Sequence, residues 1–85
     1  MKFSYSQHAV EQMNKRGISE KEVQKTINSP ERIIQEEDYV VYQRMQDSQT
    51  IKYLIRVFIN MAKKPPLVIT VYRTSKISKY YEDKI

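Results

Sequence analysis

Residues 50–60 read TIKYLIRVFIN, and this stretch is the most informative strand pattern in the sequence. Apolar and polar side chains alternate along it, and successive side chains of a β-strand point to opposite faces of the sheet. We therefore predict a strand with two distinct faces. The first set is expected to face a core and the second to face away from it: Ile51, Tyr53, Ile55, Val57 and Ile59 against Lys52, Leu54, Arg56, Phe58 and Asn60.

Strand patterns continue on both sides of this stretch. ERIIQ (31–35) and YVVYQRM (39–45) precede it, and LVITVYR (67–73) follows it. The separating segments are short and rich in turn residues: Glu-Glu-Asp, Gln-Asp-Ser-Gln and Lys-Lys-Pro-Pro. Short connections favour antiparallel neighbours, so the sequence predicts an antiparallel meander.

The first thirty residues carry helix signals instead. Ser6 is a suitable N-cap for a helix to about Arg16, and Gly17, the only glycine, is its expected stop. Residues 18–23 (ISEKEV) have the pattern of a capping box with a hydrophobic staple, which predicts a second helix ending near Ser29. Lys2 to Tyr5 are expected to form a short strand.

Together these patterns predict one α+β domain over residues 1–85. Two N-terminal helices would pack on one face of a four- to five-stranded, mainly antiparallel sheet. The tail from Ser75 to Ile85 fits a short helix, an added edge strand or a mobile arm.

The alternation also predicts which side chains lie on the uncovered face. In the last strand Leu67, Ile69 and Val71 are expected to face the helices, with Val68, Thr70, Tyr72 and Thr74 opposite. In residues 39–45 the more polar set, Val40, Tyr42 and Arg44, is expected to lie on the uncovered face. That face is thus predicted to gather six cationic, aromatic or hydroxyl residues: Tyr42, Arg44, Lys52, Arg56, Thr70 and Tyr72.

Composition narrows the function classes. The 85 residues carry a net charge of +5, and the basic share lies from residue 51 onward. Such a surface attracts polyanions, of which nucleic acid is the commonest. A charged surface that only keeps the protein soluble is an equally good interpretation of the charge. There is no cysteine and no long apolar run, so a disulfide framework, secretion and membrane insertion are disfavoured, and we expect a cytoplasmic protein.

A few residues have side chains suited to chemistry on RNA. His8 is the only histidine, and histidine is the side-chain type best suited to take or give a proton in catalysis, although a helix residue without a catalytic role is the commoner case. Arginine on an open strand can bind a phosphate bidentately, and tyrosine can stack on a base or donate its hydroxyl, although such residues also occur for solubility alone.

Metal-independent cleavage of RNA needs a base, an acid and cations over the phosphate. The candidate catalytic residues are His8, Arg56 and Tyr72. The candidate RNA- or phosphate-binding residues are Lys15, Arg16, Tyr42, Arg44, Lys52, Thr70 and Arg73. The sequence predicts no metal site, because the acidic residues lie in runs typical of turns and tails. It also contains no cofactor motif.

The stretch SYSQHAVEQMNKRGISEKEVQKTINSPE, with its His-Ala pair, its helix ending in Arg-Gly-Ile and its second helix ending before proline, resembles the start of the DUF4258 family. The closing VITVYR is similar to that family as well. The resemblance implies a relation to the RelE, ParE and BrnT-like toxins of the metal-independent ribonuclease fold group. By position, the resemblance implies that the family's histidine corresponds to His8, its Arg-Gly pair to Arg16 and Gly17, and its closing Thr-Val-Tyr to Thr70, Val71 and Tyr72. The family often has an arginine where this chain has Gln12.

Three interpretations follow. The resemblance implies a toxin-like endoribonuclease of a toxin–antitoxin or phage system, with a cognate antitoxin protein covering the open face. The alternative is a non-catalytic module of phage or mobile-element origin that binds protein or nucleic acid, for which a missing arginine at position 12 is expected. A third is a homodimer formed through exposed strand edges, by the long strand at 50–60 or by the tail.

Overall fold

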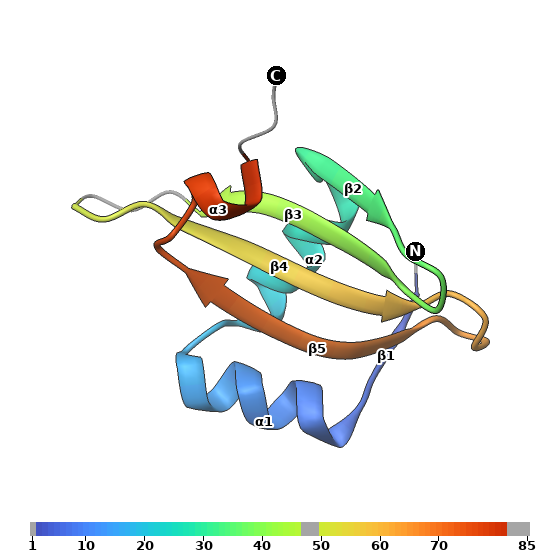
Figure 1. Ribbon diagram of the computed structural model, residues 1–85. Coiled ribbons are helices and arrows are strands. Elements are labelled where there is room, and N and C mark those ends of the chain that lie inside the picture. The colour runs from blue at the N-terminus through green and yellow to red at the C-terminus, as the bar shows by residue number, and fades with distance from the viewer. Residues whose placement is uncertain (1, 47–49, 82–85) are drawn as a thin grey trace.

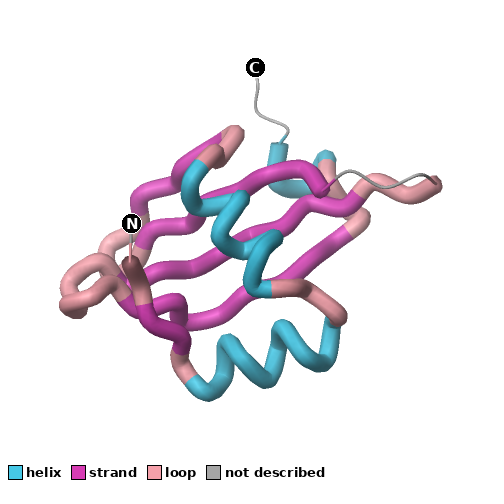
Figure 2. Tube along the Cα trace, turned by 180° about the vertical axis from the view of Figure 1, so that it is seen from behind, coloured by secondary structure: helices cyan, strands magenta, loops and turns pink. Residues whose placement is uncertain are grey.

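The computed structural model describes residues 2–46 and 50–81, without the side chains of Tyr80 and Tyr81. Within these residues, three helices and five strands follow in the order β1 (Ser4–Tyr5), α1 (Gln7–Arg16), α2 (Glu20–Asn28), β2 (Arg32–Gln35), β3 (Val40–Gln46), β4 (Tyr53–Asn60), β5 (Leu67–Thr74) and α3 (Ser78–Tyr81). The α+β fold is confirmed, because α1 and α2 lie on one face of a single sheet (Figures 1 and 2).

The sheet has the order β1-β5-β4-β3-β2. Strands β2 to β5 form the predicted antiparallel meander, and β1 adds a short parallel pairing of Ser4 and Tyr5 with Leu67 and Val68. Both edges of β4 are therefore occupied, and the expectation that this long strand could pair with a second copy is wrong. One edge of the sheet is β2. The other edge is β1 and, because β1 pairs only with Leu67 and Val68, the remaining part of β5.

The helix boundaries follow from local capping, as predicted. The Ser6 hydroxyl accepts a hydrogen bond from the Ala9 amide at 3.0 Å, and Gly17 ends α1 in the left-handed conformation with φ 67°. Ser19 and Glu22 form the complete capping box of α2. These contacts satisfy backbone groups that the first and last turns would otherwise leave without partners.

Ser6 also ties the start of α1 to the sheet. Its hydroxyl donates to the carbonyl of Ile69 at 2.8 Å, and its amide donates to the carbonyl of Val68 at 3.0 Å. One residue thus caps the helix and joins it to the last strand. Because β1 pairs with the same part of β5, residues 4–6 are fixed along this strand.

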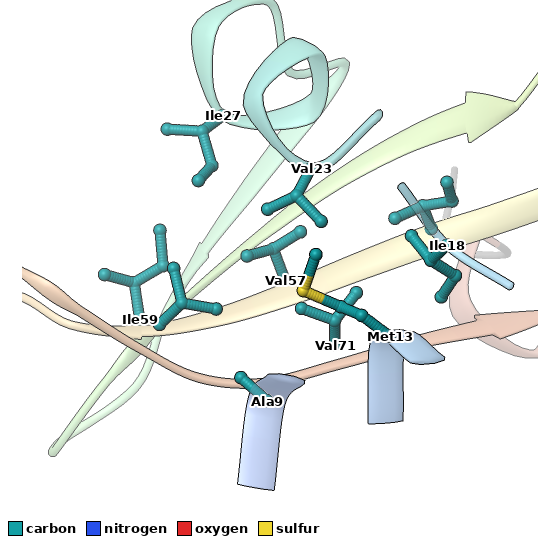
Figure 3. Close-up of a cluster of buried hydrophobic side chains, with 10 residues drawn as sticks. Ala9, Met13, Ile18, Val23, Ile27, Val57, Ile59 and Val71 are labelled. Carbon is teal, nitrogen blue, oxygen red and sulfur yellow. The ribbon is translucent and has the colours of Figure 1, made fainter. Parts of the chain in front are cut away.

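The core lies between the two helices and the sheet (Figure 3). Both halves of the predicted staple, Ile18 and Val23, are buried in it. The sheet contributes the alternate positions of β4 that the sequence indicates, Ile55, Val57 and Ile59. The full cluster comprises Ala9, Met13, Ile18, Val23, Ile27, Ile55, Val57, Ile59, Val68 and Val71.

The predicted faces of β3 are wrong. Tyr42 is the register partner of Val57, and Arg44 is the partner of Ile55. Directly paired residues share a face, so both side chains lie on the helix side, where Tyr42 packs against the core. The sequence does not indicate which alternating set of this strand faces the helices, because both sets mix apolar and polar residues.

A β-bulge reverses part of the prediction for β5. Phe58 pairs with Thr70 but Ile59 pairs with Val68, which leaves Ile69 as the extra residue. Val68 therefore enters the helix-side core together with Val71, contrary to the simple alternation. Beyond the bulge the alternation holds, and Thr70, Tyr72 and Thr74 lie on the opposite face, as predicted.

We call the face opposite α1 and α2 the second face. It is not fully open, because α3 lies over it near β3 and β4 (Figure 1). Val41 and Leu54, which point to this side, are buried. Of the three possibilities for the tail, the described part adopts the short helix, and residues 82–85 lie outside the described residues.

Candidate functional site

Strand register brings four side chains into one row across the second face. Arg32 of β2 pairs with Gln43 of β3, Gln43 pairs with Arg56 of β4, and Arg56 pairs with Tyr72 of β5. We call these four residues the polar row. Such a row runs perpendicular to the strands, with neighbouring members roughly 5 Å apart at the backbone.

The guanidinium of Arg56 is the centre of the polar row. Its Nε donates to the Gln43 side-chain oxygen at 2.6 Å, and one terminal nitrogen donates to the Tyr72 hydroxyl at 2.7 Å. The guanidinium carbon also lies 5.1 Å from the ring centre of Phe58 and 5.6 Å from that of Tyr72. Arg56 is therefore held in a fixed orientation by two hydrogen bonds and two aromatic rings.

Gln43, on the neighbouring strand β3, supports this orientation of Arg56. Its side chain is fully buried, and its Nε2 has no hydrogen-bond partner among the described residues. A buried amide donor without a partner costs stability. Gln43 thus contributes its side-chain oxygen as the acceptor for Arg56.

The C-terminal end of α1 reaches the same cluster around the edge of β5. The Arg16 guanidinium lies 5.8 Å from the ring centre of Tyr72, and its Nε donates to the Gln12 side-chain oxygen at 2.9 Å. Gln12 thus orients Arg16. Two guanidinium groups thus lie within 6 Å of the Tyr72 ring centre, one from the sheet and one from the helix.

Three aromatic rings continue from Tyr72 across the second face. The ring centres of Phe58 and Tyr72 are 5.9 Å apart at an interplanar angle of 25°, and those of Tyr39 and Phe58 are 5.5 Å apart at 46°. All three side chains are half-buried. We call Tyr39, Phe58 and Tyr72 the aromatic diagonal.

The structure unites only some of the predicted site residues. Arg56, Tyr72 and Arg16 form the cluster described above, and Thr70 lies beside it opposite Phe58. His8 and Lys15 are exposed on α1, and no contact joins either side chain to the cluster among the described residues. Lys52 is exposed just before β4.

Two predicted phosphate ligands instead anchor helices on the other side of the sheet. Arg44 donates to the carbonyl of Ser29 at the end of α2, at 2.7 Å, and lines a pocket of about 110 Å³. Arg73 donates to the carbonyl of Arg16 at the end of α1, also at 2.7 Å, with its guanidinium carbon 4.8 Å from the Tyr53 ring centre. A cation at this position complements the helix dipole.

Sequence reasoning missed four residues as parts of the site: Arg32, Gln43, Tyr39 and Phe58. Their membership depends on the register between strands, which no pattern within one strand determines. The one available signal was the alternation in β4, which puts Phe58 on the same side as Arg56.

Among residues 2–46 and 50–81, histidine and carboxylate side chains do not gather in groups of three. In the same part of the chain, the helices are too short and too polar to cross a membrane.

The fold and the site define a class of small α+β protein, with two helices on one face of the sheet and an arginine–tyrosine cluster on the other. The profile of the family described as "Domain of unknown function (DUF4258)" matches residues 5–73, and the chain belongs to this family. No curated protein and no solved structure matches the chain.

Proposed function

We propose that this protein is a toxin-like, metal-independent endoribonuclease of a toxin–antitoxin or phage system. The observation that carries the proposal is that the guanidinium groups of Arg56 and Arg16 both lie beside the Tyr72 ring, with Arg56 donating a hydrogen bond to the Tyr72 hydroxyl. Two guanidinium groups beside a phenol supply positive charge for a phosphate next to a proton donor. The family resemblance to RelE, ParE and BrnT-like toxins supports the same class of activity.

The reaction assigns a role to each group. The 2′-oxygen of RNA attacks the adjacent phosphorus and gives its proton to a base, while the bond from phosphorus to the 5′-oxygen breaks. Tyr72 donates a proton to the departing 5′-oxygen, and Arg56 and Arg16 stabilise the charge on the phosphate. His8 is the candidate base, since it lies on α1 two turns before Arg16. The products are a 2′,3′-cyclic phosphate and a 5′-hydroxyl.

The test uses purified protein and end-labelled single-stranded RNA in the presence of a chelator. We expect cleavage that leaves cyclic phosphate ends, and Tyr72→Phe should slow it about 100-fold, within the range for loss of a general acid. Arg56→Gln should also abolish most activity. Arg44→Gln is the matched control, because it removes an arginine from the neighbouring strand on the opposite face. RNA left intact by the natural protein would refute the proposal.

A second experiment addresses the biological role. Controlled expression in a bacterial host should inhibit growth and create new 5′ ends in total RNA, and both effects should disappear in an Arg56→Ala, Tyr72→Ala variant. A protein partner that neutralises the toxin would cover the second face. Growth without new RNA ends would argue against a toxin.

One observation favours the non-catalytic binding module as a second candidate. Among the described residues, nothing links the candidate base His8 to Arg56 or Tyr72. A module of phage or mobile-element origin that binds RNA or protein needs the cluster but no base. Binding of RNA without cleavage in the chelator assay would select this function.

A further inference from the structure

We propose that the second face binds a single strand of RNA that runs across the β-strands, from β2 toward β5. Its phosphates would contact the guanidinium groups along the polar row, and its bases would stack on the aromatic diagonal. The inference rests on the proposed engagement of RNA and adds the form of the substrate and its path. It also assigns binding roles to Arg32, Phe58 and Tyr39.

The positive charges define the direction of the path. Arg32 and Arg56 lie on the same row two strands apart, roughly 10 Å at the usual strand spacing. Arg16 continues the line past Tyr72 at the edge of β5. Arg32 is exposed on the edge strand, and Arg16 is exposed at the end of α1. Three guanidinium groups thus follow one line perpendicular to the strands, the arrangement expected for a chain of phosphates rather than for a single anion.

The aromatic rings lie alongside this line. Phe58 is two residues beyond Arg56 on the same strand and face, and its ring lies between those of Tyr39 and Tyr72. Base–aromatic stacking tolerates any sequence because every base has a π-face. Cations beside stacking platforms are the usual elements of single-strand recognition.

This arrangement selects single-stranded over duplex RNA. In a duplex the base faces are stacked on one another and cannot reach protein rings, and A-form helices are contacted mainly through phosphates and 2′-hydroxyls. On the same face, α3 lies over part of β3 and β4 and limits the length of the path (Figure 1). We therefore expect about two to three stacked bases.

The experiment measures binding by fluorescence anisotropy with a labelled 2′-O-methyl RNA, whose blocked 2′-oxygen prevents cleavage. The single strand should bind more tightly than its duplex. With three phosphate contacts, affinity should fall about 20-fold between about 50 mM and about 200 mM salt, a log–log slope of about −2. Arg32→Gln should weaken binding and make that slope shallower by about 0.7.

Aromatic variants test the stacking. Phe58→Leu should weaken binding about 5- to 150-fold, the range for one stacked base, whereas Phe58→Tyr keeps the ring and should bind like the natural protein. Tyr39→Leu should weaken binding as well. Because Arg56 contacts the Phe58 ring, a change at Phe58 can also affect the packing of Arg56. The Tyr39→Leu variant therefore tests stacking separately from that packing. Thermal unfolding of each variant confirms that it is folded.

The outcomes distinguish the two proposals. The proposed path is refuted if the protein binds single-stranded and duplex RNA with equal affinity, or if the Phe58→Leu and Phe58→Tyr variants bind the single strand with equal affinity. Engagement of RNA through Arg56 stands in either case. If a folded natural protein binds neither form, the path is refuted and so is the non-catalytic RNA-binding role. Cleavage of unblocked RNA in the chelator assay is scored independently of both results.

Discussion

Replacement of Arg73 by methionine tests how α1 is held against the sheet. Arg73 projects from β5 to the helix side, donates to the last carbonyl of α1 at Arg16, and stacks over Tyr53. Methionine keeps most of the apolar stem and removes both polar contacts. The change also releases the end of the helix that carries Arg16 toward Tyr72.

The expected cost follows from these contacts. A hydrogen bond from a charged donor contributes about 1.5–3 kcal/mol when shielded, and an exposed cation–π contact about 0.5–1 kcal/mol. The hydrogen bond is exposed here, so solvent screening reduces its share. We expect a loss of about 1–2 kcal/mol in the free energy of unfolding, and a melting temperature lower by about 5–15 °C for a domain of this size.

Urea denaturation followed by circular dichroism measures this loss. Lys15→Met is the matched control, since Lys15 is an exposed cation at the same helix end with no partner among the described residues. It should change stability by less than about 0.5 kcal/mol. Arg73→Lys should fall between the two, because it keeps the charge and loses the planar group. If Arg73→Met matches Lys15→Met, the anchoring of α1 through this arginine is wrong.

Three further predictions concern local structure. Gly17→Ala should cost about 1 kcal/mol, purely from the left-handed backbone, because nothing lies within 4 Å of the added methyl group, and Gly17→Asn should cost less. Ser19→Ala should cost about 1 kcal/mol through loss of the capping box, and equal urea midpoints for variant and natural protein would contradict this. Burial, with the negative charge of Glu20, raises the pKa of Tyr5 to about 12 from 10.0. The unfolded chain therefore loses this proton first, so stability is full below pH 10 and falls as the pH rises toward 12. Tyr5→Phe should flatten this decline in urea midpoints measured across the window, and an unchanged slope would refute the assignment.

Much of the fold could be predicted because local signals agreed with the tertiary structure. The capping box at Ser19 and Glu22, the stop at Gly17 and the alternation in β4 each depend on neighbours in the chain. Such signals determine where elements begin and which side of β4 is buried. They do not determine how strands align with one another.

The errors arose where alignment between strands decided the outcome. In β3 both faces carry apolar residues, so only pairing with β4 reveals that Tyr42 and Arg44 point to the helices. In β5 the bulge at Ile69 reverses the alternation for Val68. The same reason explains the partial prediction of the site. Arg56 and Tyr72 follow from alternation, whereas Arg32 and Gln43 join them only through register.

The two bonds of the Ser6 hydroxyl have a kinetic consequence. The same oxygen caps α1 and donates to Ile69, a residue 63 positions further along the chain. Closing so long a loop is entropically costly, and long-range pairing slows folding. We therefore expect α1 to acquire its native start only when β5 has joined the sheet. The N-terminal helix, although first to be synthesised, would be among the last elements to become protected against hydrogen exchange.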